Sequence, residues 1–205
     1  MSTHVIRDLG ALTALYGEPL DRSLAKELNH ISPVYRRFIE RSPFLVLSTV
    51  GPEGTDCSPR GDPPGFVEVA DDRTVLIPDR RGNNRIDSLR NIIRDPRVSL
   101  LFLIPGVGET LRINGVAEIS VDPDMLRRFR VNGKDPRSVL RVTCNAVYYQ
   151  CQKALARSRL WDPDSRAMPG DVPSAGQMLQ AVMQEGFDGA QYDRDYPEHM
   201  KRTIY

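Results

Sequence analysis

The sequence contains few of the residues from which disulfides and metal sites are built. Its 205 residues include three cysteines and three histidines. Cys57, Cys144 and Cys151 form no C-x-x-C pair, and the histidines are scattered along the chain. We therefore expect free thiols, as in a cytoplasmic protein, and no metal site made of His and Cys ligands.

Long apolar runs and an excess of one charge are also absent. No stretch reaches the roughly 18 apolar residues that a membrane-spanning helix needs, and no signal-peptide pattern is visible. The 28 Lys and Arg residues are balanced by 27 Asp and Glu residues, for a formal charge of +1, so a broad basic face for nucleic acid is not expected. We expect a soluble, cytoplasmic protein with one domain, residues 1–205, and neither a membrane nor a nucleic-acid partner.

Helical and strand patterns divide the chain into three parts. Apolar residues recur at helical spacing between residues 8 and 41, which predicts two or three short helices in an N-terminal extension, residues 1–42. Strand patterns dominate residues 43–161. The tail, residues 162–205, is expected to be rich in loops, with one short helix at about residues 175–184.

The middle part reads as a series of strands with mostly short connections. The patterns predict a hairpin of strands 44–50 and 55–58, further strands at 65–69, 74–77, 97–104, 111–121 and 139–151, and helices near 86–94 and 122–131. In strand 139–151, one face is expected to carry Leu140, Val142, Cys144, Ala146 and Tyr148. At least six strands in this arrangement favour a mainly β fold with added helices, built as an antiparallel barrel.

Three arginines gather where the helix near 86–94 begins. Arg80, Arg81 and Arg85 stand beside a helix N-terminus, whose partial positive charge disfavours cations unless an anion joins them. Gly82 frees the backbone here. The segment therefore predicts a small anion pocket.

Neighbouring residues leave two interpretations of this segment open. Asn83 and Asn84 can cap a helix or donate amide hydrogens to an anion. Alternatively, the segment is a capped turn whose solvated arginines are partly neutralised by Asp79 and Asp87.

Two further polar segments contain cations. In the first, Arg60 and Asp62 flank Gly61, so they form an ion pair that braces a loop, or Arg60 faces a ligand together with Ser58. In the second, Lys153 and Arg157 are four residues apart and share a helix face, and Trp161 follows. A lone tryptophan at this position commonly fills the edge of a core.

These three segments, in this order, resemble the FMN-binding split-barrel flavoproteins related to pyridoxamine 5′-phosphate oxidase. Most telling is Ser88-Leu-Arg-Asn-Ile-Ile-Arg-Asp-Pro-Arg-Val-Ser-Leu-Leu-Phe102, which is similar to the family's helix followed by Asn-Pro-x-Val-Ser-Leu-Leu-Phe. The resemblance covers about residues 40–161. It implies a split barrel of six or seven antiparallel strands over residues 43–161, in an uncharacterised bacterial branch of the family.

The resemblance also implies a homodimer that binds FMN in two clefts at the subunit interface. The residues that it assigns to the flavin phosphate are Arg80, Asn83, Asn84, Arg85 and Ser88. Those assigned to the ribityl chain and ring are Ser58, Pro59, Arg60 and the backbone near Ile77. The same site is expected to include Asp79, Leu89 and Thr110, with Lys153, Arg157 and Trp161 contributed by the partner chain.

The sequence and the resemblance say less about the reaction than about the cofactor. The family's oxidase has an Arg-x-His substrate clamp near its C-terminus, whereas this sequence ends Glu198-His-Met-Lys-Arg-Thr-Ile-Tyr205, so oxidation of pyridoxamine phosphate is not expected. Related proteins include reductases and users of a deazaflavin cofactor. The sequence favours an FMN-dependent oxidoreductase that exchanges a hydride between flavin N5 and a small substrate, with no catalytic residue assigned. The alternatives are a carrier or sensor that binds flavin or haem without turnover, and an interaction module without a cofactor.

Overall fold

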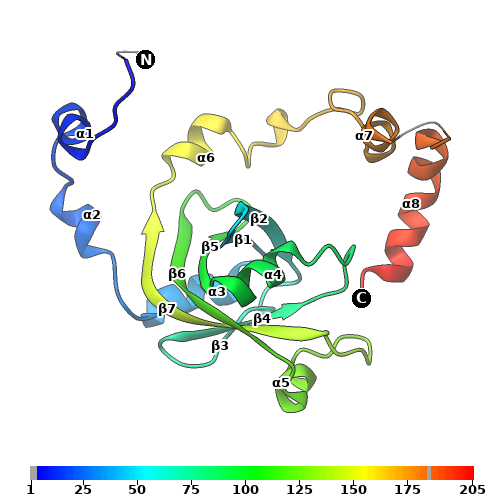
Figure 1. Ribbon diagram of the computed structural model, residues 1–205, viewed down its shortest axis with the longest axis horizontal. Helices are drawn as coiled ribbons and strands as arrows, with labels where there is room; N and C mark the ends of the chain where they lie inside the picture. Colours follow the sequence, from blue (N-terminus) through cyan, green and yellow to red (C-terminus); the bar gives the residue numbers. More distant parts are fainter. Residues whose placement is uncertain (1–3, 184–185) are drawn as a thin grey trace.

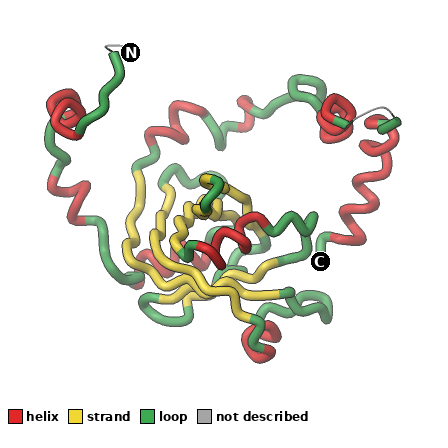
Figure 2. The backbone as a smooth tube through the Cα atoms, in the orientation of Figure 1, coloured by secondary structure: helices red, strands yellow, loops and turns green. Residues whose placement is uncertain are grey.

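The computed structural model describes residues 4–183 and 186–205 (Figures 1 and 2). Its helices are α1 (Leu9–Tyr16), α2 (Asp21–Ala25), α3 (Pro33–Arg41), α4 (Asp87–Arg94), α5 (Pro123–Arg128), α6 (Lys153–Ser158), the 3-10 helix η1 (Pro163–Ser165), α7 (Ala175–Val182) and α8 (Gly189–Thr203). Its strands are β1 (Phe44–Gly51), β2 (Gly54–Gly61), β3 (Glu68–Val69), β4 (Thr74–Asp79), β5 (Arg97–Leu103), β6 (Thr110–Ser120) and β7 (Ser138–Gln150).

The strands form one antiparallel sheet in the order β2-β1-β5-β6-β7-β4-β3. The sheet curls round into a barrel (Figure 2), but no backbone pairing joins β2 at one edge to β3 or β4 at the other. The prediction of a mainly β fold with added helices, a split barrel of six to seven antiparallel strands, is confirmed.

Alternating apolar residues build the core inside this curl. In β1, Leu45 and Leu47 are fully buried, and they pair with Phe102 and Leu100 of β5. The same alternation buries Val98 at the start of β5. Burying one face of each strand supplies most of the driving force for the barrel, and it fixes the register because a one-residue slip would expose the apolar set.

The predicted face of β7 is correct only for its first half. Leu140, Val142 and Cys144 are buried, but the register shifts opposite Asn114 and Gly115, so that the next core residue is Val147 rather than Ala146 or Tyr148. The cause is a β-bulge, which inserts an extra residue and reverses the faces beyond it. Gly115 is needed here, because a Cβ on it would lie 2.1 Å from the Thr143 carbonyl oxygen.

Two predicted elements are shorter in the structure. The strand expected at 65–69 is reduced to Glu68–Val69, because Gly65 adopts φ +92° in the turn before it. The helix expected to reach residue 131 ends at Arg128, and Val131 instead forms an isolated bridge with Lys134.

The two ends of the chain extend from the barrel as arms (Figure 1). α1 and α2 project on one side, and the N-terminal segment is held by backbone hydrogen bonds between Leu28 and Val147. The C-terminal tail passes over the barrel through α6 and α7 and returns along α8. The tail is more helical than predicted: the expected helix spans Ala175–Val182, its predicted end at Gln184 lies outside the described residues, and the 15-residue α8 was not predicted.

None of the helices in residues 4–183 and 186–205 combines the length and apolar character needed to cross a bilayer. The three cysteines, which are all in the described part, are free, and Cys144 is buried in the core.

Candidate functional site

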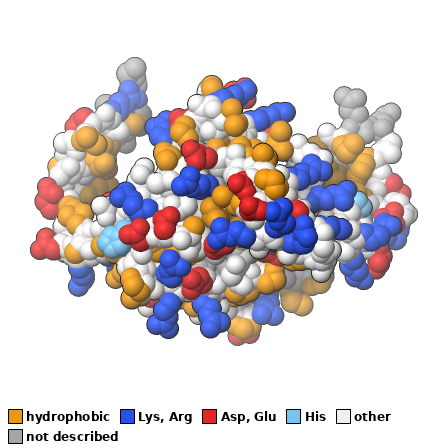
Figure 3. Space-filling view, turned by 90° about the horizontal axis from the view of Figure 1, so that it is seen from below, with side chains coloured by type: hydrophobic (Ala, Val, Ile, Leu, Met, Phe, Trp, Pro, Cys, Tyr) orange, Lys and Arg blue, Asp and Glu red, His pale blue; other side chains and the backbone are white. Residues whose placement is uncertain are grey.

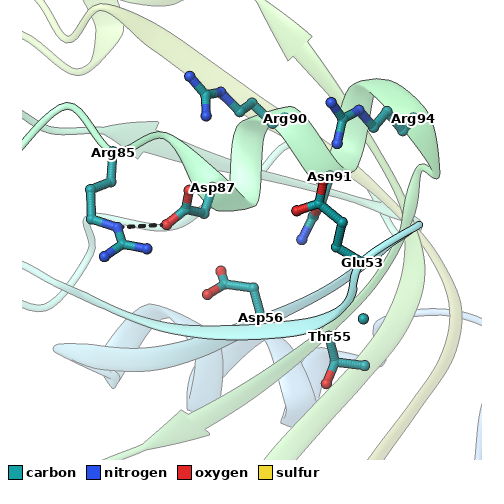
Figure 4. A pocket seen from close by; sticks show the side chains of 9 residues that line it. Glu53, Thr55, Asp56, Arg85, Asp87, Arg90, Asn91 and Arg94 are labelled. Atoms are coloured by element: carbon teal, nitrogen blue, oxygen red, sulfur yellow. Dashed lines mark hydrogen bonds and ion pairs between the residues drawn. The ribbon is translucent and has the colours of Figure 1, made fainter.

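A surface cavity of about 280 Å³ lies between the β1–β2 turn and α4 (Figure 4). Its walls are Glu53, Gly54, Thr55, Asp56, Arg85, Asp87, Arg90, Asn91 and Arg94. The start of α4 is uncapped, because the N-cap residue Ile86 has a left-handed backbone and no side-chain cap hydrogen bond. A helix start of this kind, with N–H groups that no cap side chain accepts from, favours a negatively charged ligand.

Asp56 accepts hydrogen bonds from two hydroxyl groups that the resemblance assigns to the site. Its Oδ2 accepts hydrogen bonds from Ser88 Oγ at 2.7 Å and from Ser58 Oγ at 3.0 Å. The hydrogen bond from Ser88 is the main reason why the pKa of Asp56 lies below its usual value. The structure therefore brings Ser58 and Ser88 together through an acidic residue that the sequence analysis did not select. The signal was available, since Asp56 and Ser58 are two apart on a strand and share a face.

Two ion pairs cross the opening between β2 and β4. Arg60 Nη2 lies 3.8 Å from Asp79 Oδ1, and Arg80 Nε lies 2.8 Å from Asp62 Oδ2. The suggested pair between Arg60 and Asp62 is therefore wrong, because Arg60 pairs with Asp79 and Asp62 pairs with Arg80, both across the opening. Only 5% of the Asp62 side chain is exposed, so the pair with Arg80 is shielded from solvent.

Arg80 and Asp62 are also held by the far end of the chain. Arg80 Nη1 donates to the Phe129 carbonyl oxygen at 2.6 Å, and Tyr205 Oη donates to Asp62 Oδ1 at 2.6 Å. The bond to Asp62 is the main reason why the pKa of Tyr205 is raised. The Tyr205 ring centroid lies 5.7 Å from the guanidinium carbon of Arg80. Sequence pattern gave no sign of this contact, which joins residues 143 positions apart.

The segment before α4 is organised by its own polar side chains. Arg85 Nε donates to Asp87 Oδ2 at 2.8 Å, and 76% of the Arg85 side chain is exposed. Asn83 Oδ1 accepts from the Arg85 backbone N–H, and Asn84 Oδ1 accepts from Arg137 Nη1 at 2.9 Å. Asp87 thus partly neutralises Arg85, as the alternative interpretation of this segment holds.

Gly82 does not supply the backbone freedom that the sequence analysis gave it. The left-handed positions in this segment are Asn84, with φ 61°, and Ile86, with φ 54°. A Cβ on Gly82 would meet nothing within 4 Å. Asn visits the left-handed region more readily than other residues with a side chain, whereas Ile does so at a cost.

Arg60 contains an unpaired buried donor. Its Nη1 donates to the Pro59 carbonyl oxygen at 2.9 Å, but its Nε is buried without a hydrogen-bond partner in the described part of the chain. Burial raises the pKa of the neighbouring Asp79 more than the charges of Arg60 and Arg137 lower it. A buried N–H without an acceptor costs about 1–3 kcal/mol, so this position would suit an acceptor atom of a ligand.

The apolar residues assigned to the site have mainly structural positions. Ile77 is buried in the core, and Leu89 packs against the core from α4. Their side chains therefore belong to the core, and the assignment of the backbone near Ile77 to a ligand stays a prediction.

The other predicted residues lie in a second region. Thr110 begins β6 opposite Gln150, while Lys153 and Arg157 belong to α6. Trp161 Nε1 donates to the Val107 carbonyl oxygen at 2.8 Å. Trp161 also lines a cavity of about 290 Å³, whose other walls are Gly106, Gly108, Gln152, Leu155, Ala156, Arg159 and Asp162. Within the described residues, neither Lys153 nor Arg157 has an acidic partner.

The cavity beside α4 lies in a region of the chain that matches a known protein family. Residues 31–151, more than half of the chain, match the pyridoxamine 5′-phosphate oxidase family. The chain belongs to that family. The matched region contains β1 to β7 and α4, and so the whole cavity beside α4 together with both crossed ion pairs.

Solved structures similar to this member of the pyridoxamine 5′-phosphate oxidase family share little sequence with it. HupZ of Group A Streptococcus is 17% identical over 59% of this chain and 94% of its own, with a TM-score of 0.48. General stress protein 26 of Bacillus anthracis is 18% identical over 55% and 88%, with a TM-score of 0.43. An FAD-binding protein of Mycobacterium smegmatis is 16% identical over 60% and 97%, with a TM-score of 0.41. No curated protein matches the chain.

Proposed function

We propose that this protein is a flavoprotein that binds FMN beside α4 and acts as an oxidoreductase on a small substrate. The observation that carries the proposal is the uncapped start of α4 at an arginine-lined cavity, within the region that matches the pyridoxamine 5′-phosphate oxidase family. The name of the M. smegmatis protein, which states that it binds FAD, points to the same class of cofactor.

The residues beside α4 suit a flavin phosphate. Arg85, Asn83, Asn84 and Ser88 surround the helix start, and Arg80 lies at the end of the preceding strand. Backbone N–H groups and charge-assisted donors are the usual partners of a phosphate. Arg85 and Ser88 donate to Asp87 and Asp56 in this structure, so a phosphate would take over donors that carboxylates now hold.

The rest of the flavin would extend along β2. The resemblance assigns Ser58, Pro59 and Arg60 of β2 to the ribityl chain and ring, and the buried Arg60 Nε, which has no acceptor among the described residues, supports that assignment. When bound, FMN would supply hydride exchange at its N5 atom. The protein would orient the ring, hold its acceptor atoms and exclude water from one face.

A second copy of the chain would complete the site in this proposal. α1 is eight residues long and none of its residues is buried, although Leu9, Leu15 and Tyr16 are large and apolar. Figure 3 shows further apolar side chains on the arms. A partner chain that covered these arms would bring its Lys153, Arg157 and Trp161 to the flavin. Within one chain, none of the three lines the cavity beside α4, and Trp161 lines the second cavity.

Two experiments test the proposal. Cofactor released from the purified protein by denaturation and identified by mass is expected to be FMN. Sedimentation at micromolar concentration is expected to show a dimer, and Leu15→Glu, which places a charge on the exposed face of α1, is expected to shift it toward monomer. A stable monomer that holds FMN would show that no partner chain is needed to complete the site, while the proposed flavin site would stand. A colourless protein that takes up no added FMN would reject the flavin site itself.

A further inference from the structure

The last residue of the tail, Tyr205, contacts Asp62 and Arg80 at the barrel opening. Tyr205 follows α8, whose principal packing partner is α7, and it reaches back to the barrel opening. There its hydroxyl donates to Asp62 Oδ1, and its backbone oxygen accepts from Lys134 Nζ at 2.8 Å. The end of α8 is therefore tethered at the opening between β2 and β4.

Tyr205 and Arg80 share the carboxylate of Asp62. Tyr205 Oη bonds to one oxygen of Asp62, and Arg80 Nε bonds to the other. With 5% of its side chain exposed, Asp62 has little access to water that could replace either partner. The three side chains thus form one hydrogen-bonded unit in which Tyr205 stabilises the charge that holds Arg80.

The bond from Arg80 to Asp62 opposes the binding of an anion. Asp62 occupies the Nε edge of the guanidinium, so a phosphate cannot grip that edge with two hydrogen bonds while Asp62 is in place. A phosphate close to Arg80 would also lie near the negative charge of Asp62. A ligand phosphate and Asp62 therefore compete for the same cation.

We propose that Tyr205 is an autoinhibitory latch, which holds Asp62 on Arg80 until a phosphate monoester displaces it. The inference rests on the proposed function, because it assumes that the phosphate which enters is that of FMN. Binding of the phosphate exchanges the partner of Arg80, breaks the bond from Tyr205 to Asp62 and weakens the attachment of α8 to the barrel opening. Flavin binding thereby changes how firmly the tail is attached to the barrel. Because such coupling is reciprocal, a protein that binds the detached tail would in turn favour flavin binding.

The test compares Tyr205→Phe, which removes only the hydroxyl, with Tyr196→Phe, a matched change at an exposed tyrosine of α8. Affinities for FMN and riboflavin are measured by fluorescence titration. Y205F is expected to bind FMN about tenfold more tightly than the parent protein, because the competing bond is weakened. Its riboflavin affinity should be unchanged, since riboflavin has no phosphate, and Y196F should match the parent for both flavins.

Hydrogen exchange of residues 189–205 in the parent protein gives the second readout. Addition of FMN is expected to speed exchange there, and riboflavin is not. The latch is overturned if Y205F binds FMN no more tightly than the parent, or if FMN leaves exchange of the tail unchanged or slows it. If neither protein prefers FMN to riboflavin, the proposed phosphate site falls, and the latch falls with it.

Discussion

Ser88 of α4 donates a 2.7 Å hydrogen bond to Asp56 of β2, and this contact ties the helix to the strand beside the cavity. Ser58 donates to the same carboxylate oxygen. Two hydroxyl groups that the resemblance assigns to a flavin thus donate to one carboxylate oxygen. The arrangement keeps both donors oriented in the free protein, at the expense of a negative charge beside the proposed phosphate.

Asp56→Asn is expected to lower the stability of the free protein by about 1 kcal/mol at neutral pH, because it weakens two hydrogen bonds to a charged acceptor. The pKa of Asp56 is lowered in the folded protein, chiefly by Ser88. Its stabilising contribution is therefore present above the pKa of the unfolded chain, about 4, and is lost as the pH falls through the folded value. Thermal unfolding from pH 7 to pH 3 should show the difference between variant and parent shrinking toward zero.

Glu53→Gln is the control for this experiment. Glu53 lines the same cavity, and it makes no hydrogen bond within the described residues that compares with those of Asp56. It should not reproduce the pH dependence. A difference between D56N and the parent that stays constant down to pH 3 would contradict the role given to the Asp56 charge.

Arg80→Ala and Arg85→Ala are expected to separate stability from ligand binding. Arg80→Ala leaves the nearly buried Asp62 without its ion-pair partner, so it should destabilise the free protein by about 3 kcal/mol. Arg85→Ala removes a largely exposed pair with Asp87, so it should cost less than about 1 kcal/mol. Both variants should show a smaller rise in melting temperature on addition of FMN. An unchanged FMN-induced shift in R85A would assign Arg85 to the turn alone.

Gly115→Ala is expected to destabilise the protein by about 2–4 kcal/mol, because the new Cβ would overlap the Thr143 carbonyl oxygen at the β6–β7 bulge. Gly82→Ala is the matched control: its Cβ would meet no atom within 4 Å, and a shift of less than about 1 kcal/mol in either direction is expected. Urea denaturation of both variants measures the difference. Equal effects at the two positions would mean that the bulge yields to a methyl group.

The strands and α4 could be predicted because their signals are local. Alternation in β1, β5 and β6 and the helical spacing before Asp95 depend on residues within one element. The β7 bulge could not be predicted, since an extra residue in a ladder depends on the partner strand. α8 was missed because Pro197 lies inside it and interrupts the helical pattern.

The cations of the candidate site could be predicted from the sequence, but the residues that pair with them could not. Charge alone located Arg60, Arg80 and Arg85. It could not show that the partners of Arg60 and Arg80 lie across the barrel opening, because that pairing follows from how the sheet curls. Tyr205 could not be found at all, since its contact with Asp62 depends on the path of the whole tail.

In the proposed function the protein binds a flavin through its phosphate, and the most direct test is a comparison of FMN with riboflavin. The two ligands differ only in the phosphate, and each charge-assisted contact to it contributes about 1.5–3 kcal/mol. Fluorescence titration of cofactor-free protein is therefore expected to give an FMN affinity at least about tenfold higher than that for riboflavin. Equal affinities for the two flavins would contradict the account.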